Sequence, residues 1–270
     1  MPAPKRPIAF VLASTDHGTM IVNRFDYNMT SPNQGYGVGF MLLNTSSYDM
    51  DEATMIKTLL DLRRANFGDG VVAVDAGANI GVFSVEWSRH MSGWGRVISI
   101  EAQERVFHAL AGNIAINNCF NATPIFAAVS SQPGQMRIPV PNYFAPASFG
   151  SLELRQRENT EAIGQPIDYS EEKMATVRTL SIDSLQLPRL DFLKVDVEGM
   201  EMEALEGARR SVESFRPVMF IENAKADRAA IAAYLAEYGY KEFQLGMNVL
   251  AIHANDPAAG MVQVVPPSGG

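Results

Sequence analysis

The sequence predicts an α/β fold in which a mainly parallel sheet is covered by helices. Two observations support this fold class. From residue 71 onward, short apolar runs typical of buried strands alternate with longer segments of helical periodicity. Near the end of the chain, two β-favouring runs, 240–245 and 248–253, are joined by Gly246 and Met247. That spacing predicts an antiparallel hairpin at the sheet edge.

The N-terminal region, residues 1–68, is predicted to form an arm or cap followed by one packing helix. Between residues 8 and 50, β-favouring pieces such as 19–25 are interrupted by proline and glycine, which prevents long regular elements. From Asp51 the apolar residues recur at helical spacing, and this pattern ends near Gly68.

Residues 69–255 are predicted to form the main domain. Its core strands are expected at 71–75, 96–101, 123–128, 191–196 and 217–222, with helices ending near 90 and 118 and others at 201–214 and 228–238. Residues 130–175 break this alternation with prolines and glycines, which predicts an insertion made of a hairpin and a long loop, before a strand-like run at 175–180. The segment 256–270 is rich in proline and glycine and is predicted to be a flexible tail.

Composition and charge exclude several classes of protein. The 270 residues carry a formal net charge of −8 and no dense run of Lys or Arg, so nucleic acid is not expected as a partner. No apolar run approaches the roughly 20 residues of a membrane span, and the first apolar stretch, 8–13, is too short for a signal peptide. We therefore expect a cytoplasmic protein without a membrane span. A single cysteine, Cys119, excludes an internal disulfide and a multi-cysteine zinc site.

A glycine loop follows the first core strand and opens a helix. It reads Asp75-Ala-Gly-Ala-Asn-Ile-Gly81. Gly77 and Gly81 allow a tight turn and a close approach of the main chain to a ligand, because neither carries a Cβ atom. The free N–H groups at the helix start would face the same place. Since ligands bind at the carboxyl ends of such strands, the loop predicts a ligand site.

Two carboxylates at strand ends indicate which ligand this site would take. Asp75 would repel a phosphate and attract the ammonium of the methionine part of S-adenosylmethionine (SAM). Glu101 ends the next strand, where a carboxylate can accept hydrogen bonds from both hydroxyls of a ribose. An NAD site shares this second feature, but it needs the pattern G-x-G-x-x-G, which the loop lacks. SAM is the predicted cofactor, and an NAD-dependent oxidoreductase is the alternative.

Four segments carry a family pattern: Asp75-Ala-Gly-Ala-Asn-Ile-Gly81, Asn113-Ile-Ala-Ile-Asn117, Thr179-Leu-Ser-Ile-Asp183, and Leu193-Lys-Val-Asp-Val-Glu-Gly-Met-Glu201, the last followed by Leu205-Glu-Gly-Ala208. Over about residues 48–223 they resemble the FkbM family of SAM-dependent methyltransferases. The resemblance implies a three-layer, Rossmann-like methyltransferase sheet of seven strands with SAM as cofactor. It also implies O-methylation of a hydroxyl on a sugar, glycolipid or secondary metabolite, so the expected partner is a small-molecule or glycan acceptor.

Seven residues are candidates for cofactor contacts: Asp75, Gly77, Ala78, Asn79, Gly81, Glu101 and Ala128. The family often carries a small-residue Ser-Ser-Leu stretch in the loop 147–154, where this chain has Ser148-Phe-Gly-Ser-Leu152. Phe149 departs from that pattern and leaves the shape of the acceptor pocket open. Tyr143, Phe144 and Phe149 could line an acceptor cleft or simply pack within the insertion.

Oxygen-bearing side chains end the fourth and fifth core strands. Asp196 and Glu198 follow one strand, and Glu222 and Asn223 follow the other, so all four should converge at one sheet edge. Asp196, Glu198 or Glu222 could remove a proton from an acceptor hydroxyl. Alternatively Asp196, Glu222 and Asn223 could hold Mg²⁺, which prefers oxygen ligands and would lower the pKa of a bound alcohol. The alternative for Glu198 is a purely structural role in a tight turn with Gly199.

Other chemistry-bearing residues carry weaker signals. The four histidines have no metal-ligand spacing, and only His17 is a candidate base, because the N-terminal arm could fold over the acceptor. A SAM-binding module without transfer activity is a third hypothesis. The oligomeric state stays open, with a homodimer as one option.

Overall fold

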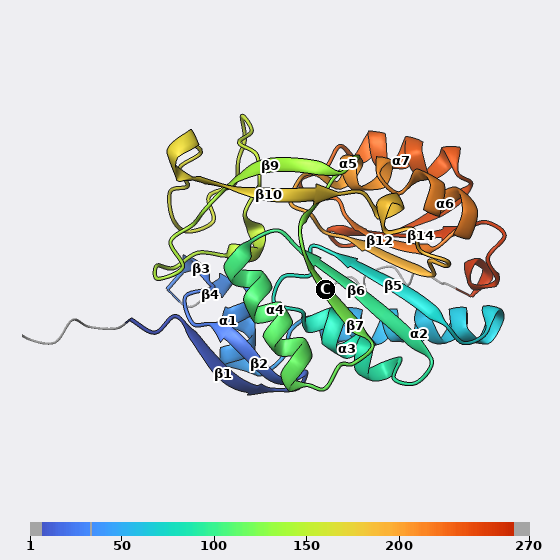
Figure 1. The fold of residues 1–270 in the computed structure, drawn as a ribbon, viewed down its shortest axis with the longest axis horizontal. Helices are drawn as coiled ribbons and strands as arrows, with labels where there is room; N and C mark the ends of the chain where they lie inside the picture. The colour runs from blue at the N-terminus through green and yellow to red at the C-terminus, as the bar shows by residue number, and fades with distance from the viewer. Residues whose placement is uncertain (1–6, 33, 262–270) are drawn as a thin grey trace, which may run out of the picture.

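A computed structural model describes residues 7–32 and 34–261 of the chain. Within this part, seven strands form a central sheet with helices on both faces (Figure 1). They are β5 (Val71–Ala76), β6 (Gly95–Glu101), β7 (Ala122–Phe126), β11 (Phe192–Val195), β12 (Val218–Glu222), β13 (Tyr240–Leu245) and β14 (Asn248–His253). Their order is β13-β14-β12-β11-β5-β6-β7, and β14 alone among them runs antiparallel to both of its neighbours. The predicted Rossmann-like, mostly parallel fold with a C-terminal antiparallel hairpin is confirmed.

Alternate side chains of β5 show why the sheet needs helices on both faces. Val71 and Ala73 pack with α2 and α3, whereas Val72 and Val74 pack with α5, α6 and α7. The helices are α2 (Met50–Phe67), α3 (Val82–His90), α4 (Glu104–Ile116), α5 (Glu201–Glu206), α6 (Arg209–Phe215) and α7 (Arg228–Glu237). Because both faces are covered, an uninterrupted apolar run rather than an alternating pattern marks this strand in the sequence.

The helix expected over 201–214 is divided into α5 and α6 at Gly207. A Cβ atom at Gly207 would lie 2.3 Å from the carbonyl oxygen of Ser130. The chain therefore breaks the helix where it passes close to the segment that follows β8, a long-range contact that local periodicity does not reveal.

The predicted insertion forms a second, smaller sheet above the first (Figure 1). It contains β8 (Ala128–Val129), β9 (Gly134–Pro139) and β10 (Met174–Leu180) in the order β8-β10-β9. The strands β9 and β10 pair antiparallel across a long connection that holds two short 3-10 turns, η1 (Phe149–Ser151) and η2 (Glu171–Lys173). The expected hairpin with a long loop is thus present, and the strand-like run 175–180 belongs to it rather than to the central sheet.

The described part of the N-terminal arm, residues 7–32 and 34–45, consists of two hairpins and a helix. They are β1 (Phe10–Thr15) with β2 (Gly18–Asn23), β3 (Asn28–Ser31) with β4 (Gln34–Tyr36), and α1 (Val38–Thr45). The arm packs against α4 through β2 and reaches the insertion through a β-bridge between Asp26 and Ala147. It therefore lies beside the carboxyl end of its own chain's sheet.

The structure differs from the expected tail over residues 256–260. Asp256 caps a 3-10 turn, η4 (Pro257–Gly260), and pairs with the guanidinium of the buried Arg63 on α2. Ala258 and Ala259 are buried, so this segment is part of the core. Residues 262–270, the rest of the predicted tail, lie outside the described residues. No helix within the described ranges combines the length and apolar character that a membrane crossing requires.

Candidate cofactor and acceptor site

A pocket of about 370 Å³ opens at the carboxyl ends of β5, β6, β11 and β12. Between β5 and β11 the strand order reverses, which is where open α/β sheets bind ligands. The volume is typical of small-molecule sites. Three parts of the chain build the walls: the sheet edge, the N-terminal arm and the η1 turn of the insertion.

The glycine loop forms one wall, and its backbone explains its residue types. Gly77 and Gly81 have positive φ angles of 81° and 89°, which favour glycine. A Cβ at Gly77 would also lie 1.7 Å from the carbonyl oxygen of Asp196, so the loops after β5 and β11 touch at this position. Gly77 and Asn79 line the pocket, whereas Ala78 and Gly81 lie behind the wall.

Asp75 lies beneath the glycine loop rather than at its mouth. Its side chain is fully buried and is not part of the pocket lining. One carboxylate oxygen accepts a hydrogen bond from Ser84 Oγ at 2.6 Å, and Oδ1 has no partner among the described residues. Burial raises its pKa, an effect opposed by the charge of Lys194 and by the Ser84 contact. The geometry thus differs from the expected direct contact with a ligand ammonium.

Glu101 lies in the pocket wall, and its carboxylate can accept more hydrogen bonds than it does within the described residues. Oε2 accepts the main-chain N–H of Asn79 at 3.0 Å, and Oε1 accepts that of Gln103 at 2.7 Å. Each carboxylate oxygen has a second lone pair, so two further hydrogen bonds can be accepted. Burial raises the pKa of Glu101 to about 7 against the lowering effect of these contacts.

Apolar residues line the pocket together with Glu101. Ile100, Ala102, Ala127, Ala128 and Leu154 contribute to the same pocket wall. Ala128 is thereby brought to the pocket, beside a carboxylate that can take ribose hydroxyls. A flat, weakly polar base next to a ribose matches this combination of surfaces.

Asp196, Glu198 and Glu222 converge on another part of the pocket wall, at the carboxyl ends of β11 and β12. Each offers a carboxylate oxygen within 4.8 Å of the others. Two ammonium groups contact this set, one buried and one partly buried. Lys194 Nζ lies 2.7 Å from Asp196 Oδ2, and Lys225 Nζ lies 2.5 Å from Glu198 Oε2. Nothing in the sequence patterns had singled out Lys225, since it lies in a loop without a motif.

The proton states of these acids depend on burial and on mutual repulsion. Burial, followed by the charge of Asp196, raises the pKa of Glu222 to about 7 and holds that of Glu198 well above its usual range. Glu222 Oε2 is buried and has no hydrogen-bond partner within the described ranges. Glu222 is therefore the acid of this set that is least engaged by neighbouring side chains.

The donor set does not fit a metal ion well. A cation at this place would compete with the ammonium groups of Lys194 and Lys225, which already contact two of the three carboxylates. Asn223, expected as a third ligand, is buried outside the pocket lining, and its amide donates to Gln244 at 3.3 Å. The structure thus brings Asp196 and Glu222 together but leaves Asn223 apart.

The arm supplies pocket residues that sequence reasoning missed. Tyr36, Val38 and Met41 line the pocket from β4 and α1, and Tyr48 and Asp49 line it from the start of α2. No strand-end or glycine signal marks them, because the arm follows its own turns and not the periodicity of the sheet. Tyr48 and Asp49 lie near enough to Asp196 for its charge to raise their pKa values, after the larger effect of burial. All five residues are candidates for acceptor contacts.

The aromatic residues of the insertion do not line this pocket. Phe149 is 2% exposed and packs on Tyr143 with ring centroids 4.9 Å apart, while Phe144 is exposed on another face. The neighbouring Ser148 and Gly150 line the pocket in their place. Phe149 therefore changes the core beneath the turn and leaves the pocket wall to small residues.

His17 serves a structural role and not that of a base at the pocket. It is fully buried, its Nε2 accepts the main-chain N–H of Tyr48 at 2.9 Å, and its Nδ1 lies 3.1 Å from Glu86 Oε1. Since Nε2 accepts, Nδ1 carries the proton and donates to Glu86. Both ring nitrogens are engaged, and His17 does not line the pocket.

The sheet order and the pocket at its switch point define a doubly wound α/β domain with a ligand site. The methyltransferase FkbM domain family matches residues 75–242 of this chain, which is more than half of its length. The chain belongs to the FkbM methyltransferase family, and the resemblance noted in the sequence is confirmed.

Individual relatives are more distant. Methyltransferase sdnD from Sordaria araneosa is 27% identical over an alignment of 166 positions, which covers 53% of this chain and 62% of that protein. The crystal structure of methyltransferase FkbM from Methylobacillus flagellatus is 18% identical, with a TM-score of 0.48 over 68% of this chain and 43% of that one. A precorrin-6y C5,15-methyltransferase structure from Geobacter metallireducens is 16% identical, with a TM-score of 0.43 over 77% and 89% of the two chains. This chain therefore spans less than two thirds of the first two relatives.

Proposed function

We propose that the protein is a SAM-dependent methyltransferase that methylates a hydroxyl oxygen of a small-molecule or glycan acceptor. The observation that carries the proposal is that one pocket joins the glycine loop and Glu101 to the acids Asp196, Glu198 and Glu222. A nucleoside site and a proton-accepting edge thus share a single cavity, as methyl transfer to a hydroxyl requires.

The residues present fit SAM. Glu101 could accept the ribose hydroxyls, the apolar wall that includes Ala128 would suit the base, and Gly77 and Asn79 would hold the methionine part. SAM, when bound, supplies a methyl group on a positively charged sulfur. Asp75, under the loop, would act on the ligand by its charge and by holding Ser84 at the start of α3.

Proton removal from the acceptor hydroxyl is assigned to the acid edge. Glu222 is the preferred base, because its free oxygen and its pKa of about 7 suit a group that must accept a proton near neutral pH. Asp196 is held by Lys194 and Glu198 by Lys225, so both would orient the acceptor or share the proton. The same two lysines favour a mechanism without Mg²⁺.

The two alternatives predict different binding. An NAD-dependent oxidoreductase would bind NAD⁺, but a loop with Gly77 and Gly81 four residues apart lacks the glycine pattern of dinucleotide sites. A silent SAM-binding module would bind the cofactor without transferring its methyl group. The three acids inside the pocket argue for transfer.

Calorimetric titration with S-adenosylhomocysteine and, separately, with NAD⁺ tests the cofactor before any acceptor is known. We expect micromolar binding of S-adenosylhomocysteine and none of NAD⁺, and weaker binding in Glu101→Gln. Transfer of a labelled methyl group from SAM is then screened over sugars, glycolipids and secondary metabolites, with and without EDTA. Binding of NAD⁺ in place of S-adenosylhomocysteine would refute the proposal, and cofactor binding without any transfer would favour the silent module.

A further inference from the structure

The η1 turn of the insertion closes directly over the glycine loop. Ser148, Gly150 and Ser151 line the pocket from the side opposite the sheet edge. A Cβ atom at Gly150 would lie 2.6 Å from the side-chain nitrogen of Asn79. The turn and the loop are therefore in contact, and a ligand on the loop would lie under the turn.

Three anchors hold this turn, and they come from three different parts of the chain. The main-chain N–H of Phe149 donates to Asp26 Oδ1 of the arm at 2.9 Å, and its carbonyl accepts from Gln103 Nε2 at 2.8 Å. At the far end of the turn, Lys225 Nζ donates to the carbonyl oxygen of Ser151 at 2.9 Å. The first two anchors are buried contacts at one residue, Phe149, whereas the third comes from a partly buried ammonium group.

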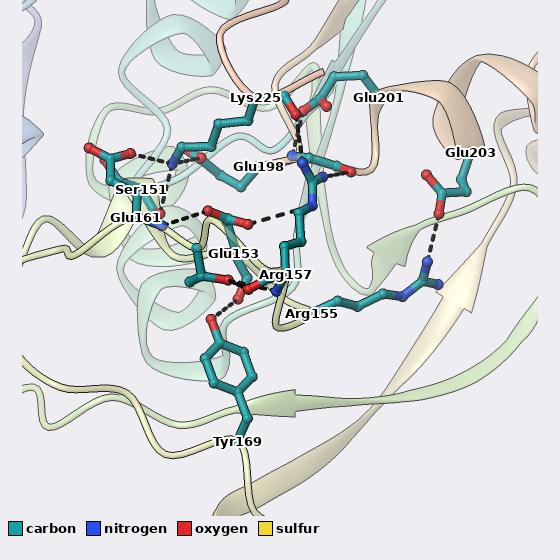
Figure 2. Close-up of polar contacts among 12 residues, drawn as sticks. Ser151, Glu153, Arg155, Arg157, Glu161, Tyr169, Glu198, Glu201, Glu203 and Lys225 are labelled. Carbon is teal, nitrogen blue, oxygen red and sulfur yellow. Dashed lines mark hydrogen bonds and ion pairs between the residues drawn. The ribbon is translucent and has the colours of Figure 1, made fainter. Parts of the chain in front are cut away.

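The ammonium of Lys225 spends its other donors on two carboxylates. It lies 2.5 Å from Glu198 Oε2 at the acid edge and 2.9 Å from Glu161 Oε2 in the insertion (Figure 2). An ammonium has three N–H donors, so the contacts to Ser151, Glu198 and Glu161 use all of them. The Lys225 side chain is only 14% exposed, so water competes weakly for these contacts.

Arg157 of the insertion holds the main chain of the loop after β12, in which Lys225 lies. Its Nη1 donates to the carbonyl oxygen of Lys225 at 2.6 Å, its Nη2 donates to that of Gly199, and its Nε lies 3.5 Å from Glu153 Oε2 (Figure 2). Arg157 thus ties the insertion to the loops after β11 and β12, and Lys225 of the second loop donates a hydrogen bond to Ser151 of the insertion. The loop after β11 carries Asp196 and Glu198, and the loop after β12 directly follows Glu222.

We propose that Lys225 is a positioning residue that fastens the η1 turn over the cofactor pocket and so controls how fast the spent cofactor leaves. The inference rests on the proposed function, because it takes the pocket as a SAM site. With the Lys225 contact in place, the turn covers the glycine loop, and release of the ligand requires the contact to Ser151 to break.

The test measures the dissociation rate of radiolabelled S-adenosylhomocysteine, chased with unlabelled ligand, together with hydrogen exchange of the segment 148–161. We expect Lys225→Met to speed dissociation about tenfold or more and to speed exchange in that segment, because a charged, buried hydrogen bond is lost. The association rate should change less, and Lys225→Arg should restore slow dissociation to within about threefold, because it keeps a charged donor.

Arg155→Met is the matched control. Arg155 also ties the insertion to α5, through Glu203 at 2.6 Å, but half of its side chain is exposed and it does not line the pocket (Figure 2). We expect its dissociation rate to equal that of the unaltered protein. If Lys225→Met destabilises the whole fold, hydrogen exchange also rises in β5 and β11. The dissociation rate of the milder variant Lys225→Gln is then compared with that of Arg155→Met.

Unchanged dissociation in a folded Lys225 variant would overturn the inference, as would equal acceleration by Arg155→Met. Failure of the unaltered protein to bind S-adenosylhomocysteine would instead refute the proposed function. The two failures are therefore distinguishable in one experiment.

Discussion

The side-chain amide of Asn113 pairs with the main chain of Ile21 as a neighbouring strand would. Oδ1 of Asn113 accepts the N–H of Ile21 at 2.5 Å, and Nδ2 donates to its carbonyl oxygen at 3.2 Å. The same Nδ2 also donates to the carbonyl oxygen of Ile80 in the glycine loop at 2.8 Å. One fully buried asparagine of α4 thus joins the arm to the loop that lines the cofactor pocket.

Replacing Asn113 should lower the free energy of unfolding by more than the loss of a surface hydrogen bond does. We expect Asn113→Ala to lower the free energy of unfolding by about 3 kcal/mol, because it leaves buried main-chain groups of Ile21 and Ile80 without partners. Urea denaturation followed by circular dichroism measures the change. Cofactor affinity should fall as well, since the glycine loop loses a support.

Asn117 offers a control one helical turn further on. It forms the same two-way pair with Thr19, but at the surface, where water can replace the lost contacts. Asn117→Ala should therefore cost only about 1 kcal/mol. Equal losses in the two variants would show that the link to the glycine loop adds nothing.

The two asparagines illustrate what the sequence could predict. The segment Asn113–Asn117 was recognised as part of a family pattern, yet its role as a partner for β2 depends on the arm folding back onto α4. The strands of the central sheet were predicted closely, because burial on both faces leaves apolar runs with clear limits. The break at Gly207 and the ordered turn after Asp256 were not, because each is set by contacts between distant segments.

Gly77 is expected to tolerate no side chain. Its φ of 81° is unfavourable for alanine, and a Cβ would also lie 1.7 Å from the carbonyl oxygen of Asp196. Gly68 is a control for positive φ, since its φ is 78° and, apart from residues next to it in the chain, nothing lies within 4 Å of a Cβ atom built there. Thermal unfolding should show Gly68→Ala losing about 1 kcal/mol and Gly77→Ala losing at least about 3 kcal/mol.

A comparable loss in both glycine variants would mean that backbone strain alone is responsible. The difference between them isolates the contact between the loops after β5 and β11, which brings the glycine loop next to the acid edge. If Gly77→Ala folds as well as Gly68→Ala, the two loops can separate without penalty.

Binding of S-adenosylhomocysteine should depend on pH through Glu101. Burial raises the pKa of Glu101 to about 7, and hydroxyl donors from a ribose favour the ionised carboxylate. Affinity should therefore increase as the pH rises, by about tenfold between pH 6 and pH 8, because only the ionised fraction is competent to bind. Calorimetry at several pH values measures this slope.

Glu101→Gln should flatten the slope and weaken binding at pH 8, whereas Glu222→Gln should leave the slope in place. These two variants separate the pocket acids that have a pKa of about 7. A slope that survives in Glu101→Gln would assign the titration to another group and remove the support for ribose binding at Glu101.

The candidate site was predictable only where residues end a core strand. Glu101, Asp196 and Glu222 could be placed because parallel strands deliver their last side chains to one edge. Lys225 and the arm residue Tyr48 could not, because they reach the pocket from segments whose course depends on tertiary contacts. Asp75 was identified as a strand end, but its side chain turns beneath the loop to meet Ser84.

Glu222 is expected to carry the proton transfer once an acceptor is found. Its ionised form accepts the proton, so kcat should rise with pH through about 7. Glu222→Gln should lower kcat at least about 100-fold and abolish that rise, while affinity for S-adenosylhomocysteine stays within about threefold. Asp49→Asn serves as the control, because Asp49 lines the same pocket from the turn before α2 and is not one of the three acids that converge at the ends of β11 and β12. It should alter the KM of the acceptor and keep most of kcat. If Glu222→Gln retains its rate and Glu198→Gln loses it, the base is Glu198 instead.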